Sequence, residues 1–261
     1  MEHAQDPDGG EPGSDPGPGH GFATTRWTWV EAAGGAESER ARLALAELCQ
    51  IYWYPLYAFV RRLGVPESEA QDVVQDFFAR LIEKRGLARV TRGHGRFRSF
   101  LRVAVRNHLA NLRDRERAAR RGGGRVRLEI DADGAAERFA RDPASDASPD
   151  RAFDRVWALE LMATCQRALE ADYAGSGRGE VFRVLRPLLK PGAGASLARA
   201  AAELGMAEGA TRVALHRLRT RFRDRLRQEI ARTVSTEAEI EQELLDLFRA
   251  VGSPGDPGPG L

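Results

Sequence analysis

Apolar residues recur at steps of three and four positions through most of the chain, which is the spacing of amphipathic helices. A clear example is the stripe formed by Val73, Val74, Phe77, Phe78, Leu81 and Ile82. Alternating runs of β-branched residues bounded by turn residues, the pattern of strands, are scarce. We therefore predict an all-α fold with two helical modules joined by a flexible linker.

The first module is predicted to span residues 22–121. An apolar helix or helix pair ends before Gly64, and a second helix starts at Pro66, where the missing N–H of proline costs little. A third helix is expected from about Arg96 to Arg121, because three consecutive glycines follow it.

The other segments follow from composition and end signals. Residues 1–21 and 253–261 are predicted to be disordered tails, since Gly, Pro and acids cannot bury enough apolar surface. Residues 122–152 are predicted to be a flexible acidic linker, and residues 153–234 the second module. A C-terminal helix at 235–252 would begin with a capping box. That helix is expected either to regulate the protein or to pack against the second module.

Charge is strongly segregated along the chain. Residues 89–121 hold eleven arginines against two acids, a net charge of +9, and residues 212–232 hold eight against two, a net charge of +6. The segment 128–160 and the tail from Ser235 each have a net charge of −5. Two basic islands predict a nucleic-acid partner, and the acidic linker would compete with that partner for the islands. This interpretation requires that internal acids do not neutralise the arginines.

Residues 197–219, with the sequence LARAAAELGMAEGATRVALHRLR, are typical of a helix-turn-helix. Ala201 is small enough for two helices to cross closely, Gly205 supplies the turn, and Met206 fills the gap between the helices. In the second helix, Val213, Leu215, Leu218, Phe222 and Leu226 are predicted to face inward. An outward stripe of Arg212, His216, Arg219, Arg223 and Arg227 suits a DNA major groove.

The first basic island suits single-stranded DNA, because phosphates attract cations and unstacked bases need planar or apolar surfaces. Phe97 and Phe100 are expected in the core, which leaves the arginines and the glycine-containing loop before them as the functional candidates.

Other classes of protein fit less well. Cys49 and Cys165 form no CxxC motif, and no metal-ligand spacing or complete nucleotide-binding loop is present, so we expect no enzymatic activity and no cofactor. No apolar run is long enough to span a membrane, and a cytoplasmic location is expected.

Together these segments resemble the bacterial RNA polymerase sigma factors of the extracytoplasmic-function type. The stretch DVVQDFFARL at residues 72–81 resembles the family's polymerase-binding helix, and FRSFLRVAVRN at residues 97–107 its promoter-melting helix. The helix-turn-helix is similar to the family's reader of the upstream promoter element. The run YWYPLY at residues 52–57 and the glycines 122–124 are similar to a long-linker subgroup, here with a C-terminal extension.

The resemblance implies a site for each partner. Contacts with the clamp helices of the largest polymerase subunit are implied for Asp72, Gln75, Asp76 and Arg80. Contacts with the minus-10 element are implied for Arg92, His94, Arg96, Arg98, Arg102, Arg106 and Asn107. Contacts with the minus-35 element are implied for Glu208, Thr211, Arg212, His216, Arg217 and Arg219. Further implied partners are the flap of the second-largest subunit and an anti-sigma factor. The alternative is a stand-alone helix-turn-helix regulator that binds duplex DNA without the polymerase.

Overall fold

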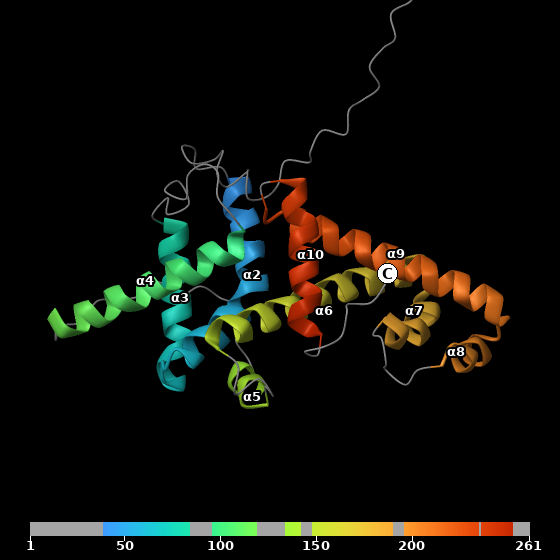
Figure 1. Cartoon of the computed structure of the whole chain (residues 1–261), viewed down its shortest axis with the longest axis horizontal. Coiled ribbons are helices and arrows are strands. Elements are labelled where there is room, and N and C mark those ends of the chain that lie inside the picture. The colour runs from blue at the N-terminus through green and yellow to red at the C-terminus, as the bar shows by residue number, and fades with distance from the viewer. Residues whose placement is uncertain are drawn as a thin grey trace, which may run out of the picture.

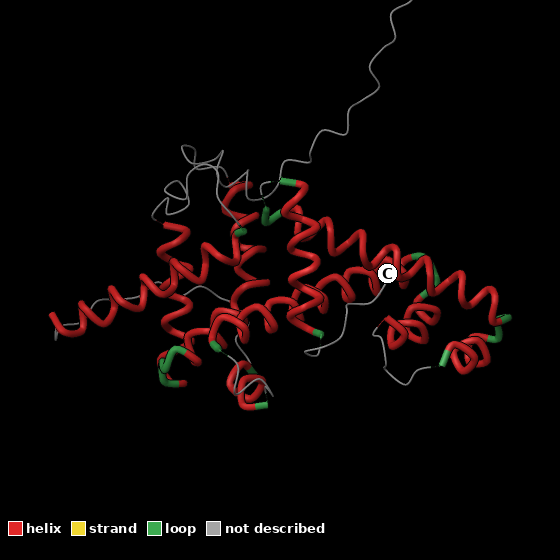
Figure 2. The backbone as a smooth tube through the Cα atoms, viewed as in Figure 1, coloured by secondary structure: helices red, strands yellow, loops and turns green. Residues whose placement is uncertain are grey.

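The computed structural model describes residues 39–83, 96–118, 134–141, 148–189, 196–234 and 236–252. These residues form helices and turns with no strand among them (Figure 2), which confirms the all-α fold. The predicted terminal tails lie outside the described residues, as does most of the predicted linker.

Helix α2, Glu39–Arg62, is the centre of the first half of the molecule. It is one continuous helix with Pro55 inside it, rather than a helix pair. Every residue from Tyr52 to Val60 is buried, because other helices surround this part of α2. The surrounding helices are α3 (Glu67–Glu83), α4 (Phe97–Ala118), α5 (Ala135–Ala140) and α6 (Pro149–Gly175).

Helix α3 begins directly after Pro66, as the sequence predicts. Gly64 makes the preceding turn in the left-handed region with a φ of 88°, and two acids occupy the first turn of the helix, where its dipole favours them. The predicted apolar stripe is buried at Val74, Phe77 and Phe78. The apolar stripe packs against the core, and the opposite, polar side of α3 is partly exposed.

Helix α6 joins the two halves of the molecule. Pro149 occupies its first position, and Ser148 caps it by accepting a hydrogen bond from the N–H of Arg151. The helix packs against α2 and also against helices of the second half, so the two modules form one packed body (Figure 1).

Part of the segment assigned to a flexible linker is helical in the structure, namely α5 and the first turn of α6. Aromatic contacts explain why α5 is held in place. Phe139 packs edge-on against Tyr57, and the guanidinium of Arg138 lies 3.7 Å from the ring centre of Tyr54.

The second half consists of short helices packed around one long helix. Its elements are α7 (Gly179–Leu185), the 3-10 turn η1 (Arg186–Leu189), α8 (Leu197–Leu204), α9 (Glu208–Ala231) and α10 (Glu237–Val251). The turn between α8 and α9 lies at Gly205, which has a φ of 61°. Leu215 and Leu218 of α9 are buried as predicted. Val213 is 49% exposed, so its predicted inward position is wrong: it lies about 200° around the helix from buried Thr211.

Helix α10 begins with the predicted capping box. The N–H of Glu239 donates to the Thr236 hydroxyl, and the N–H of Thr236 donates to the Glu239 carboxylate. The apolar side of α10, with buried Ile240, Leu244 and Leu247, packs against α6 and α9. The packing role expected for this helix is therefore confirmed. In Figure 1, α10 stands between the group of α2, α3 and α4 and the group of α7, α8 and α9.

Candidate nucleic-acid interface

Helix α4 carries a row of arginines, formed by Arg96 just before the helix and by Arg98, Arg102 and Arg106 along it. Their spacing places the last three on one side of the helix, as the sequence predicts. That side faces α6 and α10, and at Arg106 it is also exposed to solvent. We call these four residues the α4 arginine row.

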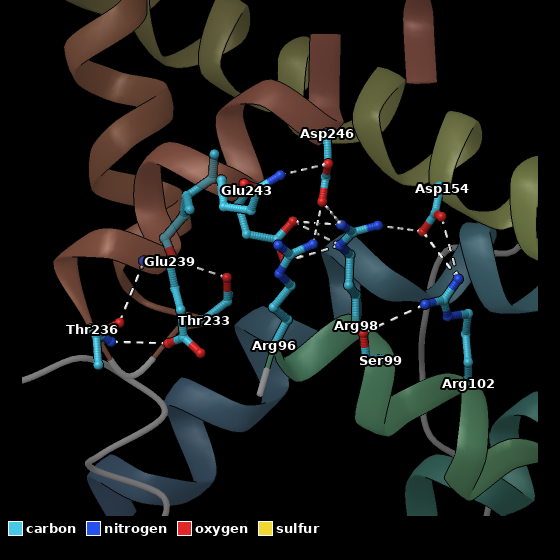
Figure 3. A network of polar contacts seen from close by, with 12 residues as sticks. Arg96, Arg98, Ser99, Arg102, Asp154, Thr233, Thr236, Glu239, Glu243 and Asp246 are labelled. Atoms are coloured by element: carbon cyan, nitrogen blue, oxygen red, sulfur yellow. Dashed lines mark hydrogen bonds and ion pairs between the residues drawn. The ribbon is translucent and has the colours of Figure 1, made fainter. Parts of the chain in front are cut away.

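Arg98 lies at the centre of a buried ionic network (Figure 3) and is 4% exposed. Its Nε donates to both carboxylate oxygens of Glu243, at 2.8 and 3.0 Å, and Glu243 is itself 1% exposed. Its two terminal nitrogens reach Asp154 at 2.5 Å and Asp246 at 3.1 Å. The guanidinium also lies 4.7 Å from the ring centre of Trp157. Arg98 therefore ties α4 to both α6 and α10.

The other three arginines of the row contact acids of the same two helices. Arg96 pairs with Asp246 and lies 3.6 Å from Glu243, both on α10. Arg102 contacts Asp154 at 3.3 Å and Asp150 at 3.5 Å, both on α6. Arg106 donates to Asp150 at 2.7 Å. Exposure rises along the row, from the buried Arg98 to the exposed Arg106, so water screens the last pair most strongly.

The network shifts the ionisation of its members. Burial raises the pKa of Glu243, and the hydrogen bond and charge of Arg98 only partly oppose this shift. Burial acts to raise the pKa of Asp246 as well, but the hydrogen bond and charge of Arg96 outweigh it, so this pKa is lowered. For Arg98, burial acts to lower the pKa, yet the hydrogen bond and charge of Glu243 raise it. Asp246 is thus the more persistent anion of α10.

The expectation that the arginines of the first island stay clear of internal acids is wrong for the whole α4 arginine row. These side chains form ion pairs with carboxylates because two acidic segments fold back onto α4. Of the other residues predicted to contact the minus-10 element, Asn107 is exposed on α4. Arg92 and His94 lie outside the described residues.

The predicted polymerase-binding residues share the polar side of α3. Asp72, Gln75, Asp76 and Arg80 are all partly exposed. Within this group, Arg80 donates to the carboxylate of Asp76 at 2.8 Å, and the Nε2 of His108 on α4 lies 3.3 Å from the same carboxylate. Asp76 therefore also helps to hold α3 against α4.

The second helix of the predicted helix-turn-helix exposes most of its candidate residues. Glu208, Arg212, His216, Arg217 and Arg219 are exposed along α9. Arg219 also donates to the backbone carbonyl of Leu188 at 3.1 Å, which ties it to η1.

Thr211 is the exception among the residues predicted to contact the minus-35 element. It is fully buried, and its hydroxyl donates to the carbonyl of Ala207 at 3.1 Å. Its side chain occupies the inward stripe that continues through Leu215 and Leu218. Thr211 is therefore a packing residue in this structure.

The carboxylates that face the α4 arginine row were not predicted as partners of these arginines. They are Asp150 and Asp154 of α6 and Glu243 and Asp246 of α10. Their signal in the sequence is the pair of acidic segments, whose sign is opposite to that of the first basic island. The net charges of these segments do not show which arginines the acids contact.

The remaining chemistry of the described residues is sparse. They contain no group of three or more His, Cys, Asp or Glu side chains placed to hold a metal ion. No helix among them has both the length and the apolar character needed to cross a membrane. Both cysteines are free and buried, and burial raises the pKa of each thiol to about 12.

These features define an all-helical protein in which α9 exposes several arginines and the α4 arginine row is held in ion pairs. Residues 52–119 match the family model of Sigma-70 region 2, a domain of RNA polymerase sigma factors. The matched segment includes the C-terminal half of α2 from Tyr52, all of α3 and all of α4. No curated protein and no solved structure matches the chain.

The match supports a role as an RNA polymerase sigma factor in general. For such factors the partners are core RNA polymerase and promoter DNA, and the role in transcription initiation is not catalytic.

Proposed function

We propose that this protein is a sigma factor of the extracytoplasmic-function type, from the long-linker subgroup with a C-terminal extension, which directs core RNA polymerase to specific promoters in the cytoplasm. The observation that carries the proposal is the match to Sigma-70 region 2 over α2, α3 and α4. It covers the two segments whose sequences resemble the family's polymerase-binding and promoter-melting helices.

In this proposal the polar side of α3 docks on the clamp helices of the largest polymerase subunit. Asp72 and Gln75 are partly exposed there, and the ion pair between Asp76 and Arg80 presents a fixed pattern of charge. The second half of the molecule would contact the flap of the second-largest subunit. An anti-sigma factor remains a proposed partner.

Promoter recognition is divided between the two halves. Arg92 and His94, together with the α4 arginine row and Asn107, would hold unpaired bases and phosphates of the minus-10 element. Helix α9 would read the minus-35 element with its exposed arginines, because arginine pairs with phosphates and with guanine edges in the major groove.

Charge reversal on α3 tests the docking step. The change is Asp72→Arg, at a partly exposed position on the polar side of α3. Glu170→Arg, at an exposed position in the second half of α6, makes the same change of charge away from α3 and is the matched control.

The expected result is that core polymerase retains the wild-type protein and the Glu170→Arg variant and loses the Asp72→Arg variant. Transcription reconstituted with core polymerase on a promoter library should follow the same order. Failure of the wild-type protein to bind core polymerase or to support any transcript would refute the proposed function.

The stand-alone regulator is the second candidate, and one observation favours it. Helix α9 exposes Arg212, His216 and Arg217, while the α4 arginine row is engaged with acids. Tight and sequence-specific binding of duplex DNA without polymerase, combined with no retention by polymerase, would establish this alternative.

A further inference from the structure

The contact between α4 and the helices α6 and α10 is made largely by long charged side chains. Helix α10 packs its apolar side against α6 and α9 and turns Glu243 and Asp246 toward α4. Helix α6 likewise meets α4 through Asp150 and Asp154. The apolar packing of α10 and its ionic contact with α4 thus lie on different sides of the helix.

The four carboxylates occupy the positions that DNA phosphates would need. A guanidinium that donates to a carboxylate at 2.5 to 3.3 Å offers those same N–H groups to phosphate oxygens. Both ligands are anions that bind arginine in the same geometry, so they compete for it. The acids also place negative charge beside the row, which repels an approaching nucleic-acid backbone.

We propose that α10 and the first turns of α6 hold the α4 arginine row in a closed, DNA-excluding state, and that anionic nucleic acid binds α4 only when these carboxylates are displaced. The protein would thus carry its own inhibitor in Asp150, Asp154, Glu243 and Asp246. The biological meaning of this closure rests on the proposed function, in which α4 contacts the minus-10 element.

Within the row, Arg98 is held more firmly than the other three arginines. Arg98 is buried, has three acidic partners and lies over Trp157, so it stays in place when the outer pairs open. Arg102 and Arg106 also lie over the rings of Phe153 and Phe59, but Arg96, Arg102 and Arg106 are all more exposed than Arg98, so water reaches their ion pairs. Opening would therefore free these three arginines without unpacking the core below them.

Neutralising one acid on each covering helix tests the closure. The double variant Asp154→Asn/Asp246→Asn removes a carboxylate of α6 and a carboxylate of α10 that face α4. The matched control is Asp172→Asn/Glu237→Gln, which removes the same charge from the same two helices. In this control Asp172 is an exposed residue near the end of α6, and Glu237 is an exposed residue in the first turn of α10.

The probe is a labelled oligodeoxythymidine, whose binding is followed by fluorescence anisotropy in a series of salt concentrations. The Asp154→Asn/Asp246→Asn variant is expected to bind about tenfold more tightly than the wild-type protein at low salt. Each additional phosphate contact steepens the salt dependence by about 0.7 in slope, so Arg96 and Arg102, which lose a carboxylate partner in this variant, give about 1.4. The control variant should keep the wild-type affinity and slope.

Hydrogen exchange provides a second readout that does not depend on a substitution. Saturating oligodeoxythymidine should increase amide exchange in the last two turns of α10 of the wild-type protein, because the acids there lose their arginine partners. Far-ultraviolet circular dichroism of the double variant should remain that of the wild-type protein. A variant that has lost helix content would leave the exchange experiment on the wild-type protein to decide.

Two results would overturn the closure. One is equal affinity and slope for the folded double variant and its control. The other is protection of α4 amides by the oligonucleotide in the wild-type protein with no change in α10 exchange. Neither result depends on the polymerase: if DNA affinity rises in the double variant while core polymerase ignores the chain, the closure stands and the proposed sigma-factor function fails.

Discussion

Removal of the buried arginine at the centre of the network gives the sharpest test of how the two halves are held together. The change is Arg98→Ala, which deletes all contacts of this side chain with Glu243, Asp154 and Asp246. Glu243 is 1% exposed and retains only the more distant Arg96, at 3.6 Å. The variant therefore leaves a buried carboxylate with little compensation.

The cost follows from the burial of both partners. Removing one member of a buried ion pair typically costs about 3–5 kcal/mol, because the other charge stays desolvated. For a protein of this size, each kcal/mol lowers the melting temperature by about 2–4 °C, so a decrease of roughly 6–20 °C is expected. The lost contact with the Trp157 ring acts in the same direction.

The direction in which the stability loss of the Arg98→Ala variant changes with pH also follows from the structure. The pKa of Glu243 is already raised by burial, and the loss of Arg98 raises it further. A carboxyl whose pKa is higher in the folded state contributes stability at low pH and loses it as pH rises through the folded pKa. The deficit of the Arg98→Ala variant should therefore be largest near neutral pH and shrink on acidification.

The assay is thermal or urea unfolding followed by circular dichroism, for Arg98→Ala, for the single variants Arg98→Met and Glu243→Leu, and for the double variant Arg98→Met/Glu243→Leu. Replacing both charges by apolar side chains should recover most of the lost free energy of unfolding, because no unpaired charge remains. A loss below about 1 kcal/mol for Arg98→Ala, the range of a solvent-exposed pair, would refute the reasoning. So would a deficit that does not change with pH.

Three further outcomes are expected. Arg212→Glu should weaken the binding of duplex DNA that carries the upstream element by about 1–3 kcal/mol in a gel-shift titration, and unchanged binding would contradict the assigned face of α9. Thr236→Ala should lower the free energy of unfolding by about 1 kcal/mol, because it removes the side-chain half of the capping box; no loss in urea unfolding would argue against that cap. Cys49 and Cys165 should resist Ellman's reagent in the folded protein at neutral pH and react in denaturant, since burial raises both pKa values to about 12; rapid labelling of the folded chain would show that the thiols are accessible.

Local signals in the sequence were enough to predict most helices and several of their ends. Pro66 marks the start of α3, Gly205 the turn before α9, and Thr236 with Glu239 the start of α10. These features depend on residues within one or two helical turns of each other, so the sequence around them determines them. Val213 was misplaced because an apolar residue on a helix is not always on its buried side.

The candidate site was predicted less completely, because its state depends on residues far apart in the chain. The spacing of Arg98, Arg102 and Arg106 shows that they share a side of α4, but not what that side faces. Asp154 and Glu243 lie 56 and 145 residues beyond Arg98 and reach it only when α6 and α10 fold back.

The sequence by itself thus determined the helical class, several helix ends and the segregation of charge, all of which follow from local spacing and composition. Only the tertiary structure decided that the α4 arginine row is paired with acids while Arg212 and Arg217 of α9 are exposed. The physical reason is that a charge pair needs two groups within a few ångströms, and packing of the apolar sides of α6 and α10 sets those distances.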